Sequence, residues 1–350
     1  MRRKTLSTRT AGLAITGAGL ILAGFGLTRP DTRSQVSGTD AAHVVAVNPA
    51  MVSDVPATRG AASATRAAGT TSATANAGLG AGWDLPNVDH PRIDHWIARF
   101  DTVPAMRKKF QGFLDRGGAY APMILDRLAA RGMPLDLLYL AMIESGFQPA
   151  ATSHAAAVGV WQFISETGQR YGLDIDRAVD ERRDPVRATD AALDYLDELH
   201  GRFGSWYLAA AAYNSGEGRV SRAMRAEFGR ERARSEAEYY AIWDRLPRET
   251  RDYVPLMIAA ARITKDPAAY GFRALSPEPQ AWDEITVSPA TPLARIATTY
   301  GTTVSELRAL NPHFLIGRTP NDRYYPVRLP TGSLERYAQA DAGARAVTVD

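Results

Sequence analysis

Apolar residues recur at intervals of three and four positions along the middle of the chain. Ile93, Trp96 and Phe100 follow this spacing, which is typical of the buried face of a helix. No convincing strand pattern interrupts it, so residues 86–272 are predicted to form an all-α domain. Helices are expected at Met106–Leu114, Tyr120–Arg131, Val186–Arg202, Trp206–Tyr213 and Pro247–Thr264, the last interrupted at Pro255.

The stretch Met133–Glu144 is apolar on nearly every side, as expected for a helix buried in the centre of a domain. Glu144 ends this stretch, and Gly146 supplies a C-terminal stop. Because Leu140 lies one turn earlier, the carboxyl shares an apolar face. Burial and the negative end of the helix dipole both raise the pKa of such a carboxyl, so it can donate a proton near neutral pH. The alternative is a surface glutamate at a frayed helix end.

After residue 280 the pattern changes to two strands that enclose two helices. The strands are expected at Glu284–Ser288 and Tyr324–Leu329, and the helices at Thr291–Tyr300 and Val304–Leu310. The whole chain is therefore predicted to be mainly α, with a small βααβ domain over residues 283–330. The tail, residues 331–350, is polar and rich in alanine, and no element is predicted for it.

The chain begins with a basic segment, Met1–Arg9, which is followed by the uncharged stretch Ala11–Leu27. No Ala-x-Ala cleavage site follows, so residues 1–27 are predicted to be either a signal peptide or an uncleaved membrane anchor. Residues 28–85 are predicted to be a flexible linker, because 20 of the 24 residues from 57 to 80 are Ala, Thr, Ser or Gly. We expect the protein in the periplasm or cell envelope, held at the inner membrane where residues 11–27 are retained.

The net charge of +3 invites a nucleic-acid partner, but its distribution argues against one. Residues 1–30 hold five basic residues and no acidic one, so the rest of the chain has a net charge of −2, whereas nucleic-acid binding needs a clustered basic surface. The chain has no cysteine, which excludes disulfides, thiolate metal sites and a cysteine-linked lipid anchor. No metal-ligand or nucleotide motif is present, so neither a metal nor a cofactor is expected.

What remains is acid–base chemistry by carboxylates. Asp184 is a candidate second acid, but its position before Pro185 is that of a helix N-cap. Asp180 and Glu181 stand beside two arginines, and ion pairing accounts for them. Glu144 is therefore the strongest candidate.

A set of short motifs follows Glu144 along the chain. They are Glu144-Ser145, Ser153, Gly159-Val160-Trp161-Gln162-Phe163, Ala212-Tyr213-Asn214-Ser215-Gly216 and Glu249-Thr250-x-x-Tyr253-Val254. Each is weak alone, but the combination in this order and spacing is specific. Residues 90–270 thus resemble the catalytic domain of the soluble lytic transglycosylase family, which has a lysozyme-like fold, and they look most similar to its membrane-bound transglycosylase D branch.

The resemblance implies a role for each matching residue. Glu144 matches the catalytic acid/base of the family. The implied substrate-binding residues are Ser145, Ser153, Gln162, Tyr213, Asn214, Glu249 and Tyr253. The chain departs from the family at Ala156, where many members have glycine, and at Ser165, where many have proline. It also lacks the lipidated cysteine that is usual in the transglycosylase D branch.

The resemblance also implies a reaction. Most glycosidases use two carboxylates, whereas here Glu144 would first protonate the oxygen that links N-acetylmuramic acid to N-acetylglucosamine. The ionised Glu144 would then accept the proton of the muramic C6 hydroxyl, whose attack on C1 closes a 1,6-anhydro ring without water. The alternatives are a hydrolytic muramidase on the same fold and a non-catalytic scaffold that binds the wall. Peptidoglycan glycan strands are the expected partner, together with the membrane if residues 1–27 are uncleaved.

The C-terminal unit resembles a LysM domain, a peptidoglycan-binding βααβ module. The matching residues are Ile285-Thr286-Val287, Pro292-Leu293, Ile296-Ala297, Tyr300-Gly301, Val304, Leu307 and Asn311. The Gly-Asp pair that usually precedes the first helix is replaced by Pro289-Ala290. By analogy with the family, the expected glycan contacts are Thr291, Pro292, Asn311 and Pro312.

Overall fold

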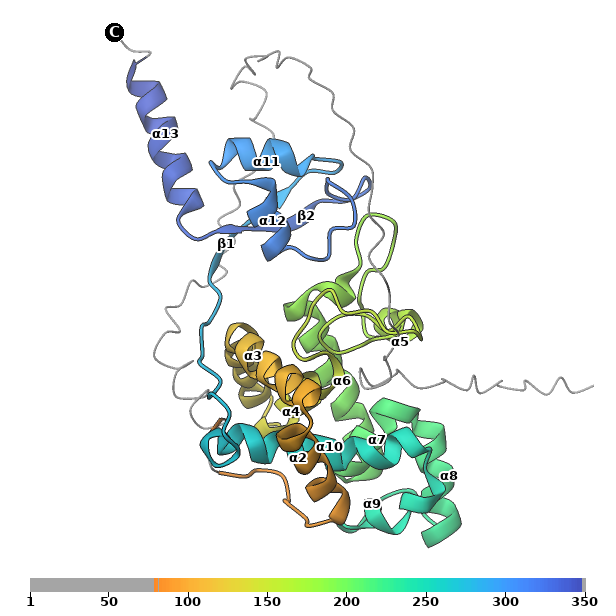
Figure 1. The fold of residues 1–350 in the computed structure, drawn as a ribbon. Helices are drawn as coiled ribbons and strands as arrows, with labels where there is room; N and C mark the ends of the chain where they lie inside the picture. Colours follow the sequence, from red (N-terminus) through yellow and green to blue (C-terminus); the bar gives the residue numbers. More distant parts are fainter. Residues whose placement is uncertain (1–78, 81, 348–350) are drawn as a thin grey trace, which may run out of the picture. The chain divides into compact units, whose positions relative to one another are not determined.

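The structure is a computed structural model that describes residues 79–80 and 82–347 (Figure 1). The predicted signal peptide or anchor, residues 1–27, and most of the predicted linker lie outside the described residues. Within the described part, no helix combines the length and apolarity that a membrane span requires. The chain divides into two compact units. The described part of the first runs to Ile175 and resumes over Glu181–Gln280, and the second consists of Asp176–Asp180 and the described residues from Ala281 onward.

The first unit is all-α, as predicted. Its helices are α2 (Pro91–Thr102), α3 (Pro104–Ala130), α4 (Leu138–Ser145), α5 (Ser165–Arg170), α6 (Pro185–Phe203), α7 (Trp206–Ser215), α8 (Glu217–Phe228), α9 (Glu238–Ala241) and α10 (Arg248–Lys265). The short 3-10 turns are η2 (Leu135–Leu137), η3 (Glu181–Arg183), η4 (Trp243–Arg245) and η5 (Pro267–Tyr270). The side chains of Asp184 and Ser205 accept hydrogen bonds from the first turns of α6 and α7, which satisfies amides that have no partner within the helix.

Two helices, α3 and α10, continue through an internal proline. Proline lacks the N–H that would bond to the carbonyl four residues earlier. In α3 the carbonyl of Gly118 has no intrahelical donor, because the residue four positions later is Pro122. It accepts instead from the backbone N–H of Glu278, at 2.8 Å. Because α3 also runs without a break through residues 115–119, the prediction of two separate helices in this region was wrong.

The same device keeps α10 continuous through Pro255, where an interruption was predicted. The carbonyl that Pro255 leaves without a donor belongs to Arg251. It accepts from the hydroxyl of Tyr239, at 2.9 Å, and from the indole nitrogen of Trp243, at 2.7 Å. Donors from outside each helix thus replace the missing amide, and α10 can carry side chains from Glu249 onward on one rigid element.

The buried stretch before Glu144 is a 3-10 turn followed by a short α-helix, not the single helix that was predicted. All eight residues of α4 are buried, and α4 packs against α3 and α10 (Figure 1). Its C-terminal end is fixed by Gly146, which has φ +61°. A β-carbon at this glycine would lie 2.1 Å from the ring of Phe113, so the chain can turn here only because the residue has no side chain.

The last residues of the predicted linker are bound to the helical unit. The amides of Asp84 and Leu85 donate to Oδ2 of Asp136, at 3.0 and 3.2 Å. Oδ1 of Asp136 lies 2.7 Å from the ammonium of Lys265, and both side chains are almost fully buried. Because Leu85 is itself buried, the ordered domain starts a few residues before the predicted boundary at residue 86.

The second unit has the predicted βααβ order. It comprises β1 (Trp282–Val287), α11 (Leu293–Thr299), α12 (Val304–Leu310) and β2 (Tyr325–Pro330). The strands pair antiparallel, from Trp282 opposite Pro330 to Val287 opposite Tyr325. Val179 is part of this unit's core and forms an isolated bridge with Phe314. The tail, for which no element was predicted, contains α13 (Ser333–Val347).

Candidate active site

Glu144 is the next-to-last residue of α4, and 1% of its surface is exposed. The hydroxyl of Tyr253, on α10, donates to its Oε1 at 2.5 Å, whereas Oε2 has no hydrogen-bond partner among the described residues. Burial raises the pKa of this carboxyl to about 8. The hydrogen bond from Tyr253 opposes the rise, and the negative charge of Glu249 adds to it. Glu144 is therefore protonated at neutral pH.

Gln162 is held in a strained loop. Its φ is +49°, in the left-handed region that non-glycine residues rarely adopt. Its amide nitrogen donates to the carbonyl of Gly159 at 2.9 Å, while its amide oxygen is buried without a partner in the described part of the chain. Gly159 is required here, because a β-carbon would lie 1.7 Å from the carbonyl oxygen of Arg182. An acceptor left open in this way is suited to an N–H or O–H group of a ligand.

Two hydroxyl groups fasten this loop on either side. The hydroxyl of Ser145 donates to the carbonyl of Val160 at 2.8 Å, and that of Tyr213 donates to the carbonyl of Trp161 at 2.7 Å. Ser145 is fully buried and also accepts from the amide of Gln148. Its hydroxyl thus joins the end of α4 to the loop that carries Gln162.

Ser153 and Ala156 belong to a turn that precedes the loop. The hydroxyl of Ser153 accepts from the amide of Ala157 at 3.1 Å, which closes the turn. Ala156 has φ +57°, so the position at which the family often has glycine is one where a β-carbon is unfavourable. The alanine that replaces the family's usual glycine is therefore held in a strained backbone conformation.

Asn214 is the next-to-last residue of α7 and is oriented by two residues of α10. The hydroxyl of Thr250 donates to its amide oxygen at 2.8 Å, and its amide nitrogen donates to Oε1 of Glu249 at 3.4 Å. No role was predicted for Thr250 from the sequence, although it lies within the motif Glu249-Thr250-x-x-Tyr253-Val254. The oxygen of Glu249 accepts, so the amide nitrogen of Asn214 faces Glu249 and the amide oxygen faces the buried hydroxyl of Thr250.

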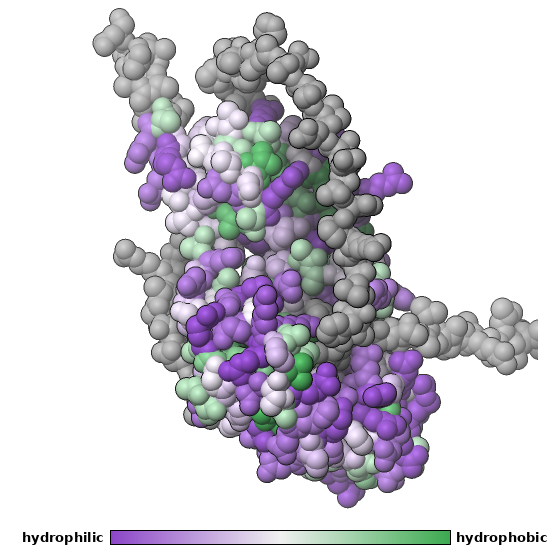
Figure 2. Space-filling view, in the orientation of Figure 1, coloured by the Kyte–Doolittle hydropathy of each residue, from purple (hydrophilic) through white to green (hydrophobic). Residues whose placement is uncertain are grey.

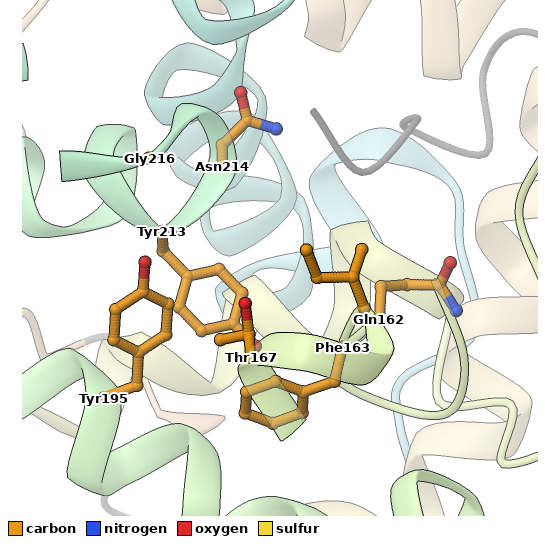
Figure 3. Close-up of a pocket in the computed structure, with 8 residues that line it drawn as sticks. Gln162, Phe163, Thr167, Tyr195, Tyr213, Asn214 and Gly216 are labelled. Carbon is orange, nitrogen blue, oxygen red and sulfur yellow. The ribbon is translucent and has the colours of Figure 1, made fainter. Parts of the chain in front are cut away.

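A pocket opens beside these residues (Figure 3). It is lined by Gln162, Phe163, Ile164, Thr167, Tyr195, Tyr213, Asn214 and Gly216. The rings of Phe163, Tyr195 and Tyr213 gather side by side, while the amides of Gln162 and Asn214 point away from them (Figure 3). The cavity holds about 30 Å³, room for one or two waters, so it can accept a substituent of a sugar ring.

The pocket includes three of the residues that the resemblance implied, Gln162, Tyr213 and Asn214, and it leaves out Glu144 and Tyr253. Glu144 lies close enough to raise the pKa of the Tyr213 hydroxyl, whose pKa is raised mainly by burial. Sequence reasoning missed Tyr195 and Thr167. Tyr195 lies on the predicted helix of α6, and nothing in the periodicity of that helix separates a pocket aromatic from a core one.

In the second unit, the expected glycan contacts differ in accessibility. The side-chain amide of Asn311 donates to the carbonyls of Leu307 and Arg328, at 2.7 and 2.8 Å, and its oxygen accepts from the amide of Arg328. Asn311 thus joins α12 to β2 and is buried. Thr291 is also buried and donates to the carbonyl of Ser288, whereas Pro292 is exposed and Pro312 is half-buried.

Two family models match the chain. Residues 124–235 match the transglycosylase SLT domain, and residues 281–346 match the LysM-like domain of lytic transglycosylase MltD. The first match contains the Gln162 loop and Asn214, together with Glu144.

Curated relatives match over about half of the chain. Membrane-bound lytic murein transglycosylase D of Escherichia coli (strain K12) is 39% identical over 198 residues, which are 56% of this chain and 43% of the relative. Membrane-bound lytic murein transglycosylase C of Haemophilus ducreyi is 26% identical over 174 residues, which are 44% of this chain and 43% of the relative. The chain spans less than half the length of these relatives. It contains a transglycosylase SLT domain followed by a LysM-like domain, and it is similar in sequence to membrane-bound lytic murein transglycosylase D.

Proposed function

We propose that this protein is a lytic murein transglycosylase in which Glu144 acts as both acid and base. The observation that carries the proposal is a fully buried carboxyl with a pKa of about 8, positioned by Tyr253 and with one oxygen unpartnered in the described structure. This carboxyl belongs to an SLT domain. The substrate is the β-1,4 bond between N-acetylmuramic acid and N-acetylglucosamine in peptidoglycan.

In the first step Glu144 donates its proton to the oxygen of the scissile bond. A protonated carboxyl at neutral pH is the state that this step needs. The bond between C1 of muramic acid and that oxygen breaks, and the substrate's own acetamido group stabilises the positive charge at C1. The open amide oxygen of Gln162 and the amide of Asn214, which Thr250 orients, are suited to hold the acetamido group and the ring in place.

In the second step the ionised Glu144 accepts the proton of the muramic C6 hydroxyl. The C6 oxygen bonds to C1 and closes a 1,6-anhydro ring, so the carboxyl returns to its protonated form and no water is consumed. Other buried acids of the first unit have structural partners: Asp136 pairs with Lys265, Glu181 pairs with Arg187, and Asp184 caps α6. A single carboxyl that changes role fits this arrangement.

The proposal requires that substrate reach the unpartnered oxygen of Glu144. Because Glu144 is 1% exposed and does not line the pocket, the bound glycan must displace side chains at the entrance. Catalytic hydrogen bonds are often completed only when substrate binds. The fastened loop around Gln162 and the rigid α10 would hold the remaining contacts fixed while this occurs.

The second unit and the N-terminal segment complete the proposal. We infer that the LysM-like unit retains the enzyme on peptidoglycan, since a second binding module raises the effective concentration of the first on a polymer. The exposed Pro292 and half-buried Pro312 are better placed than the buried amide of Asn311 to contact a glycan. We also propose an envelope location, with residues 11–27 as either a signal peptide or an inner-membrane anchor.

Digestion of purified sacculi, followed by mass spectrometry of the soluble fragments, tests the proposal. Anhydro ends, one water lighter than reducing ends, are expected from the wild-type protein. The Glu144→Gln variant should release no fragments while unfolding as cooperatively as the wild type. Reducing ends would instead identify a hydrolytic muramidase, and binding of sacculi without release of fragments would identify a non-catalytic scaffold.

A further inference from the structure

A second hollow of the first unit lies between α8 and the start of α10. Its volume is about 560 Å³, many times that of the pocket beside Gln162. It is lined by Arg219, Arg222, Ala223, Ala226, Asp244, Arg245, Leu246, Pro247 and Arg251. Four of these nine residues are arginines and one is an acid. Hydrophilic side chains cover the part of the surface that carries α8 and α9 (Figure 2). We call this hollow the arginine groove.

The charges of the arginine groove are only partly compensated. Arg245 pairs with Glu227 at 2.8 Å, and Arg251 pairs with Asp244 at 3.4 Å. The lining of the groove thus holds four arginines and a single acid, Asp244. Arg222 is exposed, and among the described residues it has no ion pair or hydrogen bond. It is therefore free to bind an anion.

The arginine groove and the candidate active site are built on the same two junctions of the chain. At the junction of α7 and α8, Asn214 lines the pocket, and Arg219 donates to the carbonyl of the next residue, Ser215, at 3.2 Å. At the start of α10, Glu249 bonds to Asn214, while Pro247, two residues earlier, lines the groove. A ligand that occupies the active site can therefore extend a branch into the groove.

The chemistry of the groove favours carboxylates. The guanidinium group binds a carboxylate through two parallel hydrogen bonds, and small alanines at positions 223 and 226 leave room for a chain to lie between the arginines. In peptidoglycan, the muramic sugar carries a short peptide with several carboxylates. We propose that the arginine groove binds the acidic stem peptide of the glycan strand that is being cleaved. This inference rests on the proposed function, because it assumes a peptidoglycan strand in the active site.

The inference predicts that Arg222 affects the cleavage of peptide-bearing strands alone. Arg222→Glu should lower kcat/KM on soluble, uncrosslinked strands by about tenfold, as expected for the loss of a charge-assisted contact. It should leave cleavage of strands stripped of their peptides by an amidase unchanged, and Arg222→Lys should retain part of the activity. The difference between the two substrates should shrink as salt is added.

Arg225→Gln is the matched control. Arg225 lies on the same helix and pairs with Glu231 at 2.6 Å, but it does not line the groove. This variant should cleave both substrates at the wild-type rate. Equal loss on both substrates in Arg222→Glu, or no loss on either, would overturn the inference, because the peptide would then not be what Arg222 contacts.

A binding measurement separates this inference from the proposed function. Free stem peptide, titrated into the full-length protein and followed by NMR, should shift the resonances of α8 in the wild type and not in Arg222→Glu. If the wild type cleaves neither substrate, the proposed function fails, and the titration still decides whether the groove binds the peptide. Unchanged α8 resonances in the wild type, or shifts with inorganic phosphate but not with the peptide, would contradict peptide binding.

Discussion

Two buried carboxyl groups lie near opposite ends of the segment from η2 to α4, and their partners differ. Asp136 faces the ammonium of Lys265 at 2.7 Å and accepts two backbone amides. Within residues 79–80 and 82–347, Glu144 has one hydrogen bond, from Tyr253, and no cation pairs with it. Both are 2% exposed or less. The first arrangement stabilises a negative charge, whereas the second stabilises a proton.

The comparison shows that burial by itself does not give a carboxyl its function. The partner decides whether the buried group is held as an anion or as an acid. Asp136 uses its charge to attach the segment that precedes α2 to the domain. Glu144 retains a proton that it can donate.

Replacing Glu144 gives the largest expected effect on the free energy of unfolding. A pKa raised from 4.5 to about 8 means that the folded state binds the proton more tightly than the unfolded state. Wild-type stability relative to Glu144→Gln should therefore be fully present below pH 4.5 and should fall as the pH rises to about 8, by up to about 5 kcal/mol. Urea denaturation of both proteins at several pH values measures this. A difference that does not change with pH would mean that Glu144 is ionised in the folded protein.

Breaking the ion pair should have the next largest effect. Lys265→Met leaves Asp136 as an uncompensated buried charge, which should lower the free energy of unfolding by about 3–5 kcal/mol. The double variant Lys265→Met with Asp136→Leu removes both charges and should regain part of this loss. Chemical denaturation of the two variants at pH 7 measures both effects, and equal stability of the single and double variants would argue against the pairing.

Two further substitutions should move the pKa of Glu144 in opposite directions. Tyr253→Phe removes the hydrogen bond that stabilises the ionised carboxyl, so the pKa should rise by about one unit. Glu249→Gln removes a neighbouring negative charge, so the pKa should fall by a similar or smaller amount. NMR titration of the labelled Glu144 carboxyl measures these shifts without turnover. In active variants the alkaline limb of the pH profile of kcat/KM should move with the pKa of Glu144. If both substitutions moved this pKa in the same direction, the assigned causes would be contradicted.

Ala156→Gly should have the smallest effect and serves as a control. Relief of the left-handed strain at φ +57° should stabilise the protein by about 0.5–1 kcal/mol, less the added entropy of the unfolded chain. The pKa of Glu144 should not change, because the turn does not contact it. Thermal unfolding measures the gain in stability, and the NMR titration checks that the pKa of Glu144 is unchanged.

Much of the fold could be predicted from local patterns in the sequence. The spacing of Ile93, Trp96 and Phe100 marked a buried helix face, and all three are buried in α2. The N-cap Asp184 was identified because the signal lies within a few residues of the helix start. The βααβ order of the second unit was predicted for the same reason.

Interactions between distant residues could not be predicted in the same way. Pro255 was predicted to interrupt its helix because the donors that replace its missing amide, from Tyr239 and Trp243, lie elsewhere in the sequence. The internal roles of the Ser145 hydroxyl and of Thr250 likewise depend on loops that come together only in the folded chain.

The sequence by itself thus determined several helices of the first unit, the change to a βααβ unit, and the position of Glu144 at the end of an apolar helix that Gly146 stops. Those features depend on residues close to one another along the chain. Only the tertiary structure decided that Glu144 meets Tyr253 and that Arg222 lines a groove, where no other described residue pairs with it. The pKa of a carboxyl and the net charge of a groove depend on every residue nearby in space. Such residues can be far apart in the sequence, as are Glu144 and Tyr253, which lie 109 positions apart.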